Sequence, residues 1–368
     1  MSLESYKKAL FQKDNYQIPF YLKEKHIPCL DGLRALAIIF VILSHIAFNF
    51  SNKFFLKLEL GSFGVNIFFV ISGFLITSLL LKEQVTKGSV SFRSFYIRRA
   101  LRILPVAYLF IFVLIILNYL YKLNLSSIDF LRTAFFCENF VGHPKFVPNG
   151  HFWSLSTEEQ FYLLFPIFLV KDSNFFFKLS FLLFLFAPLI IYSYYHINTN
   201  FYLINYILFF LDGIFANGML TILIGCISAV LFFRFPNQLN RKFNNAGLLQ
   251  FLLLVIAWCA SHCILPIGLH LTISSFFIAA FVISLITNKN TVWYKILNYK
   301  PVKYIGILSY SLYIWQQIFT FNQPWASSSM PGTSIALNTS LLIIVAMLSY
   351  HGYEKQFLKL KSRFTRVK

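Results

Sequence analysis

An arginine and a histidine stand eleven residues apart in an otherwise apolar stretch, at Arg34 and His45. Eleven residues make about three turns of an α-helix, so the two side chains share one face, about 16 Å apart along the axis. An imidazole that titrates near neutral pH can take a proton from a hydroxyl group and return it, so His45 is a candidate general base. Taken alone, the arginine could be an interfacial anchor and the histidine an ordinary core residue. Two such side chains on one face of a membrane helix are costly in lipid unless they face a cavity inside the protein.

Three further arginines, Arg98, Arg99 and Arg102, precede an apolar run that is predicted to span the membrane over about 103–121. Arg98 and Arg102 are four residues apart and therefore share a helix face. Guanidinium groups bind phosphate oxygens bidentately, so this cluster suits a polyanion at the cytoplasmic mouth of the helix. The other interpretation is topological, because basic residues favour cytoplasmic flanks in any case.

Two carboxylates, Glu158 and Glu159, are predicted to lie on the outer side, in the first turn of a span that ends at about 170. Ser156 and Glu159 have the spacing of a capping box, which gives Glu159 a structural role. Glu158 has no such role and could orient or charge-balance the imidazole of His45. These groups mark a route from a phosphate clamp inside, past a base, to a carboxylate outside. The separation of about 16 Å between Arg34 and His45 is comparable to the reach of a pantetheine arm, which fits a coenzyme A thioester fed from the cytoplasm.

The elements that must position these residues are membrane helices. Of the 368 residues, 58% are hydrophobic and only 12% are charged. This composition excludes an ordinary soluble domain and allows roughly ten spans of about twenty residues. The formal net charge of +19 resides in loops between apolar runs, where the positive-inside rule explains it, so we expect no nucleic-acid partner. The five cysteines are scattered and odd in number, so we predict neither a disulfide framework nor a metal site.

The predicted fold is an all-α integral membrane protein of about ten transmembrane helices, with both termini in the cytoplasm. Residues 1–29 form a cytoplasmic tail, 30–353 the transmembrane domain and 354–368 a basic cytoplasmic tail. The stretch 201–233 is long enough for one crossing or two. One crossing, over about 219–234, keeps the later basic loops inside and is preferred, while a crossing by 201–218 is left open. The other spans are predicted at about 33–50, 62–81 and 103–121, in a fourth stretch that ends at about 170, and at about 175–195, 247–264, 268–287, 304–321 and 335–352.

Several short motifs occur in a fixed order along most of the chain. They are the Arg34–ten residues–His45 pair, Gly64-Val65…Phe68-Phe69-Val70…Ser72-Gly73-Phe74, Arg98-Arg99-x-x-Arg102, Trp153-Ser154-Leu155-x-x-Glu158-x-x-Phe161-Tyr162, Ser309-Tyr310-Ser311-Leu312-Tyr313-x-Trp315 and Glu354-Lys355. In this order and spacing the sequence resembles the transmembrane acyltransferase-3 family of bacterial O-acetyltransferases for sugars.

The resemblance implies roles for individual residues. It associates the arginines with acyl-CoA at the cytoplasmic face, and His45 and Glu158 with acyl transfer to a carbohydrate. The predicted donor-binding residues are Arg34, Arg98, Arg99 and Arg102, and the predicted substrate-binding residues are Trp153, Ser154, Tyr313, Trp315 and Gln316. No permanently bound cofactor is expected, because acetyl-CoA would be a donor substrate.

The sequence also departs from the family pattern. Asn66 stands where the family often has aspartate, Gln316 where many relatives have histidine, and Gln356 in place of a proline. The esterase-like domain that follows the membrane domain in some relatives is absent, so we expect this chain to finish the transfer itself or with a separate partner.

The predicted function is therefore an integral-membrane O-acyltransferase of the bacterial inner (cytoplasmic) membrane. It would move an acyl group, expected to be acetyl, from acyl-CoA to a hydroxyl of a cell-surface glycan. That glycan would be an O-antigen (lipopolysaccharide), a capsule, an exopolysaccharide or a lipid-linked precursor. Membrane lipid is a further expected partner, and a homo-oligomer is left open. The alternatives are a transporter or flippase of a lipid-linked glycan and, more weakly, a protein acyltransferase. Against transport, the sequence has no paired repeats and no matching pair of broken helices.

Overall fold

The computed structural model describes residues 16–22, 27–49, 57–140, 147–171, 173–196, 201–239, 246–262, 269–321, 323–327 and 332–367. Within these ranges the regular structure is helical and contains no strand, which confirms the all-α prediction. The first fifteen residues of the predicted N-terminal tail lie outside the described part.

Helices occupy every predicted span. Among the described residues, six helical stretches are long and apolar enough to cross a membrane: Cys29–Phe48, Leu60–Lys87, Phe92–Tyr121, Phe175–Tyr194, His270–Thr287 and Ile335–Phe364. The elements that matter below are α2 (Pro28–Asn49), α4 (Leu60–Lys87), α5 (Phe92–Tyr121), α7 (Phe152–Lys171), α8 (Ser173–His196), α9 (Tyr202–Ile214), α10 (Leu220–Arg234), α12 (Ala246–Ser261), α13 (Leu269–Thr287), α15 (Lys300–Thr320), α16 (Ile335–Leu348) and α17 (Lys355–Lys361). The chain is thus a multi-pass membrane protein.

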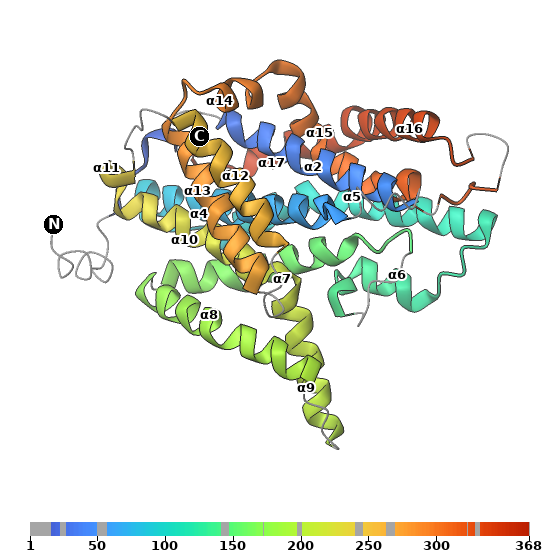
Figure 1. The fold of residues 1–368 in the computed structure, drawn as a ribbon, viewed down its shortest axis with the longest axis horizontal. Coiled ribbons are helices and arrows are strands. Elements are labelled where there is room, and N and C mark those ends of the chain that lie inside the picture. The colour runs from blue at the N-terminus through green and yellow to red at the C-terminus, as the bar shows by residue number, and fades with distance from the viewer. Residues whose placement is uncertain are drawn as a thin grey trace.

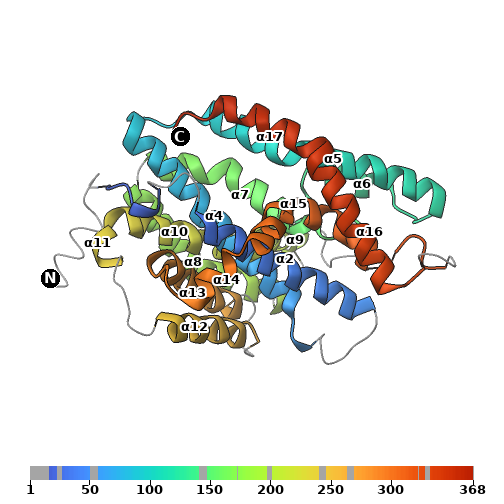
Figure 2. The ribbon, with the colours of Figure 1, turned by 90° about the horizontal axis from the view of Figure 1, so that it is seen from above.

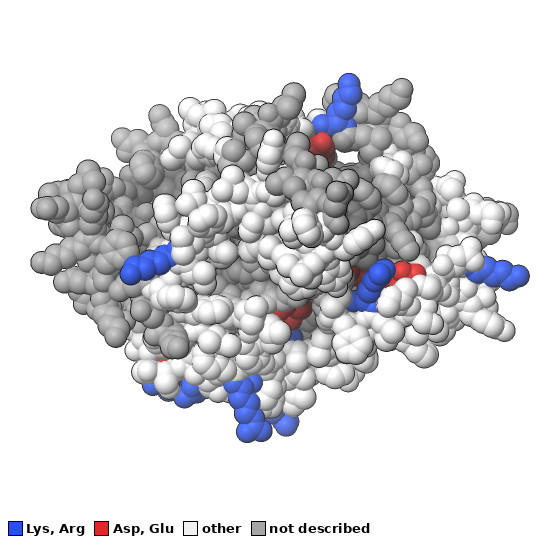
Figure 3. All heavy atoms as spheres, turned by 90° about the horizontal axis from the view of Figure 1, so that it is seen from below, with Lys and Arg blue, Asp and Glu red and all other residues white. Residues whose placement is uncertain are grey.

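The surface supports this assignment. Large apolar side chains are exposed along the helices, for example Phe112 on α5 and Phe181 on α8, which are 61% and 69% exposed. Seen from below, most of the described surface carries neither Lys and Arg nor Asp and Glu (Figure 3). Such a surface favours a lipid environment, because exposing so much apolar area to water is unfavourable.

Helix α4 lies at the centre of the bundle (Figure 1). It packs against α10 on one side and α2 on the other, and α2 in turn packs against α15. Figure 2 shows α5 and α17 side by side along one edge, while α12 and α13 pair at the opposite edge. The buried phenylalanines Phe63, Phe74 and Phe232 fill the space between the central helices.

Glycines bring α4 and α10 into backbone contact. A Cβ atom added to Gly73 would lie 2.0 Å from the carbonyl oxygen of Ile222, and one added to Gly225 would lie 2.2 Å from that of Val70. Small residues are the means by which membrane helices approach closely, since apolar burial gives little drive for association in lipid.

We therefore expect Gly225→Ala to lower the melting temperature of the detergent-solubilised protein. The added methyl group has to push α10 away from α4, and overpacking of this kind costs about 1–3 kcal/mol. Gly247→Ala in α12 is the matched control, because a Cβ atom there meets nothing within 4 Å. Equal melting temperatures for the two variants would show that the α4–α10 contact tolerates separation.

The ambiguous stretch 201–233 forms α9, a π-helical segment over Phe215–Met219, and α10. No loop reverses the chain between them, and Gly218, with φ of +93°, lies in the π-helical segment. Helix α9 projects away from the rest of the molecule (Figure 1), and its Tyr202 is 91% exposed. Helix α9 is a short apolar helix of 13 residues, and it continues into α10 through the π-helical segment.

Candidate active site

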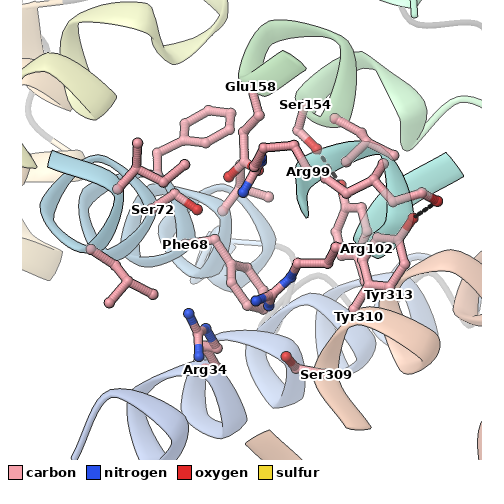
Figure 4. A pocket seen from close by; sticks show the side chains of 16 residues that line it. Arg34, Phe68, Ser72, Arg99, Arg102, Ser154, Glu158, Ser309, Tyr310 and Tyr313 are labelled. Carbon is pink, nitrogen blue, oxygen red and sulfur yellow. Dashed lines mark hydrogen bonds between the residues drawn. The ribbon is translucent and has the colours of Figure 1, made fainter. Parts of the chain in front are cut away.

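Side chains from five helices line a cavity whose empty space, including the part open to solvent, is about 750 Å³. The helices are α2, α4, α5, α7 and α15, which lie far apart in the sequence and meet around the cavity (Figure 4). Its lining combines apolar walls with charged and hydroxyl groups: Arg34, Val65, Phe68, Phe69, Ser72, Leu75, Ile76, Arg99, Arg102, Ile103, Ser154, Leu155, Glu158, Ser309, Tyr310 and Tyr313.

Three of the four predicted donor-binding arginines, Arg34, Arg99 and Arg102, line this cavity. Arg34 donates a hydrogen bond of 2.9 Å to Asp31, and Arg99 donates one of 2.9 Å to Glu159. Arg102 makes no hydrogen bond or ion pair with another residue in the described part of the chain. A guanidinium group that is withdrawn from bulk water and left without a partner favours binding of an anion.

Arg99 is also held by an aromatic face. Its guanidinium carbon lies 3.9 Å from the centroid of the Tyr162 ring, which is a cation–π contact. With Glu159 on one side and Tyr162 beneath, Arg99 has a fixed position in the cavity wall.

Arg98 lies elsewhere. Its guanidinium forms an ion pair of 3.3 Å with the buried Glu83 and donates a hydrogen bond of 2.7 Å to the carbonyl oxygen of Phe364. Glu83 also pairs with Arg366 at 3.0 Å. The structure therefore brings Arg99 and Arg102, rather than Arg98 and Arg102, to the cavity, and Arg98 joins α5 to α4 and to the C-terminal segment.

The arginines are also deeper in their helix than predicted. The sequence predicts a span from about 103, whereas α5 begins at Phe92. Arg99 and Arg102 therefore stand in the second and third turns of a 30-residue helix. The helix continues through this charged stretch because Arg98 pairs with Glu83 on α4 and Arg99 pairs with Glu159 on α7.

Glu158 lies beside the arginines, in a cavity that His45 does not line. It lines the cavity together with Arg99 and Ser72 (Figure 4). Its helix α7 begins at Phe152, so Glu158 is in the second turn and faces α4 and α5.

The predicted capping box is also wrong. Because α7 begins at Phe152, Ser156 is too far along the helix to cap its first turn. The Ser156 hydroxyl instead accepts a hydrogen bond of 3.2 Å from the backbone N–H of Glu138, and Glu159 pairs with Arg99.

His45 is half-buried near the end of α2, and its Nδ1 lies 2.6 Å from Oε1 of Gln316 on α15. His45 does not line the cavity, but Tyr313 does, and Tyr313 stands on α15 three residues before Gln316. Three residues rise about 4.5 Å along a helix. The cavity and the imidazole are therefore joined by a single turn of α15.

The five predicted substrate-binding residues separate into groups. Ser154 and Tyr313 line the cavity, and their hydroxyl oxygens are 2.5 Å apart. Gln316 contacts His45 instead. Trp153 packs edge-on against Phe69 and Trp315 against Phe110, and neither tryptophan lines the cavity.

The sequence interpretation missed a second histidine–glutamine pair. His151 is buried, and its Nδ1 lies 2.8 Å from Oε1 of Gln317, which also accepts the backbone N–H of His151. The motif that contains Trp153 and Ser154 begins two residues after His151, so adjacency to that motif was the available signal. Glu138 was missed as well. It accepts hydrogen bonds from Thr133 and Asn149, and burial raises the pKa of its carboxyl group.

No metal site emerges from the described residues, since they contain no group of three or more His, Cys, Asp or Glu side chains that could hold an ion.

Comparison with known proteins identifies the fold family. The model of a family described as "Acyltransferase domain" matches residues 27–350. The chain belongs to this acyltransferase family. The match covers α2 to α16 and therefore every helix that lines the cavity, which confirms the resemblance inferred from the motifs. No solved structure matches the chain.

Curated relatives carry related names. The chain is 32% identical to "Putative O-acetyltransferase SACOL0978" of Staphylococcus aureus (strain COL), over 92% of this chain and 58% of the relative. It is 29% identical to "Putative peptidoglycan O-acetyltransferase YrhL" of Bacillus subtilis (strain 168), over 90% and 55%. It is 28% identical to "O-acetyltransferase OatA" of Staphylococcus aureus (strain NCTC 8325 / PS 47), over 94% and 60%. The chain thus spans somewhat more than half the length of these relatives.

Proposed function

We propose that this chain is an integral-membrane O-acyltransferase that moves an acetyl group from acetyl-CoA to a hydroxyl of a cell-surface glycan. The observation that carries the proposal is the cavity in which Arg34, Arg99 and Arg102 meet one helical turn from a histidine. Such a site combines a polyanion clamp with a proton acceptor, which are the two things that transfer from coenzyme A requires. The family membership supports the same reaction class.

The phosphates of coenzyme A would bind at the arginines. Arg102 supplies the guanidinium group that has no partner in the described chain, while Arg34 and Arg99 are oriented by Asp31 and Glu159. Acetyl-CoA enters as a substrate, and no resident cofactor is proposed. Glu158 lines the same cavity as Arg99 and Arg102, and its proposed role is to position the arginines.

The chemistry at His45 is direct acyl transfer. The imidazole accepts the proton of the glycan hydroxyl while its oxygen attacks the thioester carbonyl carbon. A C–O bond forms, the C–S bond breaks, and the proton passes to the departing thiolate. The products are an O-acetyl ester and coenzyme A thiol.

The acceptor follows from chemistry and from the names of the relatives. One relative is named for peptidoglycan, so we add this polymer to the O-antigen, capsule and exopolysaccharide glycans predicted from the sequence. The remaining topology is proposed with it: about ten crossings in the bacterial cytoplasmic membrane, both termini in the cytoplasm, and the arginine mouth facing acetyl-CoA. We no longer propose the transporter, because nothing in the family or in the relatives' names supports it.

The test is acetyl transfer by the purified protein in lipid nanodiscs. We expect radiolabelled acetyl groups from acetyl-CoA to appear on a glycan acceptor, with one thiol released per acetyl group transferred. Peptidoglycan fragments, lipopolysaccharide and capsule preparations would be offered in parallel to define the acceptor. Absence of both thiol release and labelled glycan, in protein that is folded, would overturn the proposal.

A further inference from the structure

The proposed acyl transfer does not yet give Gln316 a role. It stands on α15, fully buried, and its side-chain oxygen is 2.6 Å from Nδ1 of His45, a residue 271 positions away in the chain. The same oxygen lies 3.1 Å from the Thr320 hydroxyl, which donates to the backbone carbonyl of Gln316 at 2.8 Å. Thr320 thus stands next to the amide on the following turn of the helix.

The orientation of this amide decides which nitrogen of His45 can act. An amide oxygen only accepts hydrogen bonds, so a contact between Oε1 and Nδ1 requires that Nδ1 carry the hydrogen. In the neutral imidazole the lone pair is then on Nε2, the nitrogen turned away from Gln316. The same oxygen also stabilises the positive charge that the imidazole acquires when it takes a proton.

We propose that Gln316 is a positioning residue that holds His45 in the tautomer with a free Nε2, and so sets up Nε2 as the proton acceptor. This inference rests on the proposed acyl transfer. It assigns to Gln316 a function through His45, in place of the contact with substrate that the sequence predicts.

The described residues place little other charge near His45. His151 is its titratable neighbour among the described residues, and Gln317 holds His151. The Phe321 ring lies 6.0 Å from the imidazole centroid and contributes no charge. A change of charge at position 316 should therefore be felt directly by His45.

Two substitutions separate positioning from simple packing. Gln316→Leu keeps the approximate size but removes the acceptor, whereas Gln316→Glu keeps an acceptor oxygen and adds a negative charge. We expect Gln316→Leu to lower kcat about 10- to 100-fold, the usual effect of losing a hydrogen bond to a charged group, and to leave KM for acetyl-CoA within about twofold. Gln316→Glu should regain most of kcat and move the acidic limb of the pH–rate profile to higher pH, because a carboxylate favours the protonated imidazole by about one to three pH units.

A second measurement does not depend on turnover. Diethyl pyrocarbonate modifies unprotonated imidazole, and mass spectrometry can follow the modification of His45 as a function of pH. We expect its midpoint to be higher in Gln316→Glu than in the wild type and lower in Gln316→Leu. Equal midpoints in the three proteins would overturn the positioning role, whether or not the wild type transfers acetyl groups. Wild-type kcat in Gln316→Leu would overturn it too, while loss of transfer in wild-type protein with shifted midpoints would count only against the acyltransferase proposal.

Discussion

Replacement of His45 by alanine is expected to reduce acetyl transfer about 10²- to 10⁴-fold, which is the usual contribution of a general base. The reason is that the imidazole contacts Gln316, which stands one turn of α15 from the cavity-lining Tyr313. Binding of acetyl-CoA should change little, because His45 lies outside the cavity that the arginines line. Turnover and acetyl-CoA affinity would be measured on the same nanodisc preparation.

His351→Ala is the matched control, since it removes an exposed histidine that pairs with Tyr304. That variant should keep wild-type turnover. If His45→Ala retained more than about a third of the wild-type rate, far above the range expected for a lost base, another residue would have to accept the proton.

Loss of the Arg102 guanidinium is expected to weaken acetyl-CoA binding about 10- to 100-fold, measured as Kd for Arg102→Gln. Arg102 has no partner in the described chain, so its charge is available to the phosphates of the donor. Arg102→Lys should fall between the wild type and Arg102→Gln, because lysine keeps the charge but lacks the planar fork.

Arg93→Gln serves as the control, because Arg93 stands on the same helix with its side chain exposed to solvent. Its affinity for acetyl-CoA should equal that of the wild type at physiological salt. Similar affinities for Arg102→Gln, Arg93→Gln and wild type would remove the cavity from donor binding, whereas a loss in both variants would indicate a nonspecific charge effect.

The sequence predicts the helices well but misplaces the beginning of α5. The apolar run after Arg102 suggests a span from about 103, while α5 begins eleven residues earlier, at Phe92. Hydrophobic periodicity detects the part of a helix that meets lipid, and it does not detect the part whose charges are paired inside the protein. The pairs that allow the extension, Arg98 with Glu83 and Arg99 with Glu159, join different helices and cannot be read from local spacing.

In the candidate site, too, contacts between distant helices could not be predicted from local spacing. Arg34, Arg99 and Arg102 could be found from residue type and motif, because an arginine inside a membrane helix is costly enough to need a reason. The partner of His45 could not, since Gln316 is 271 residues away and its contact depends on how α2 packs against α15.

The neighbouring contacts of Gln316 and Gln317 have a consequence for how α15 can change during evolution. The two residues point about 100° apart, and each reaches a histidine from a different part of the chain, His45 or His151. Insertion or deletion of one residue before this turn would rotate both side chains away from their histidines at once. Related sequences should therefore accommodate length changes in the loops on either side of α15, while the helix itself keeps a constant residue count up to Gln317.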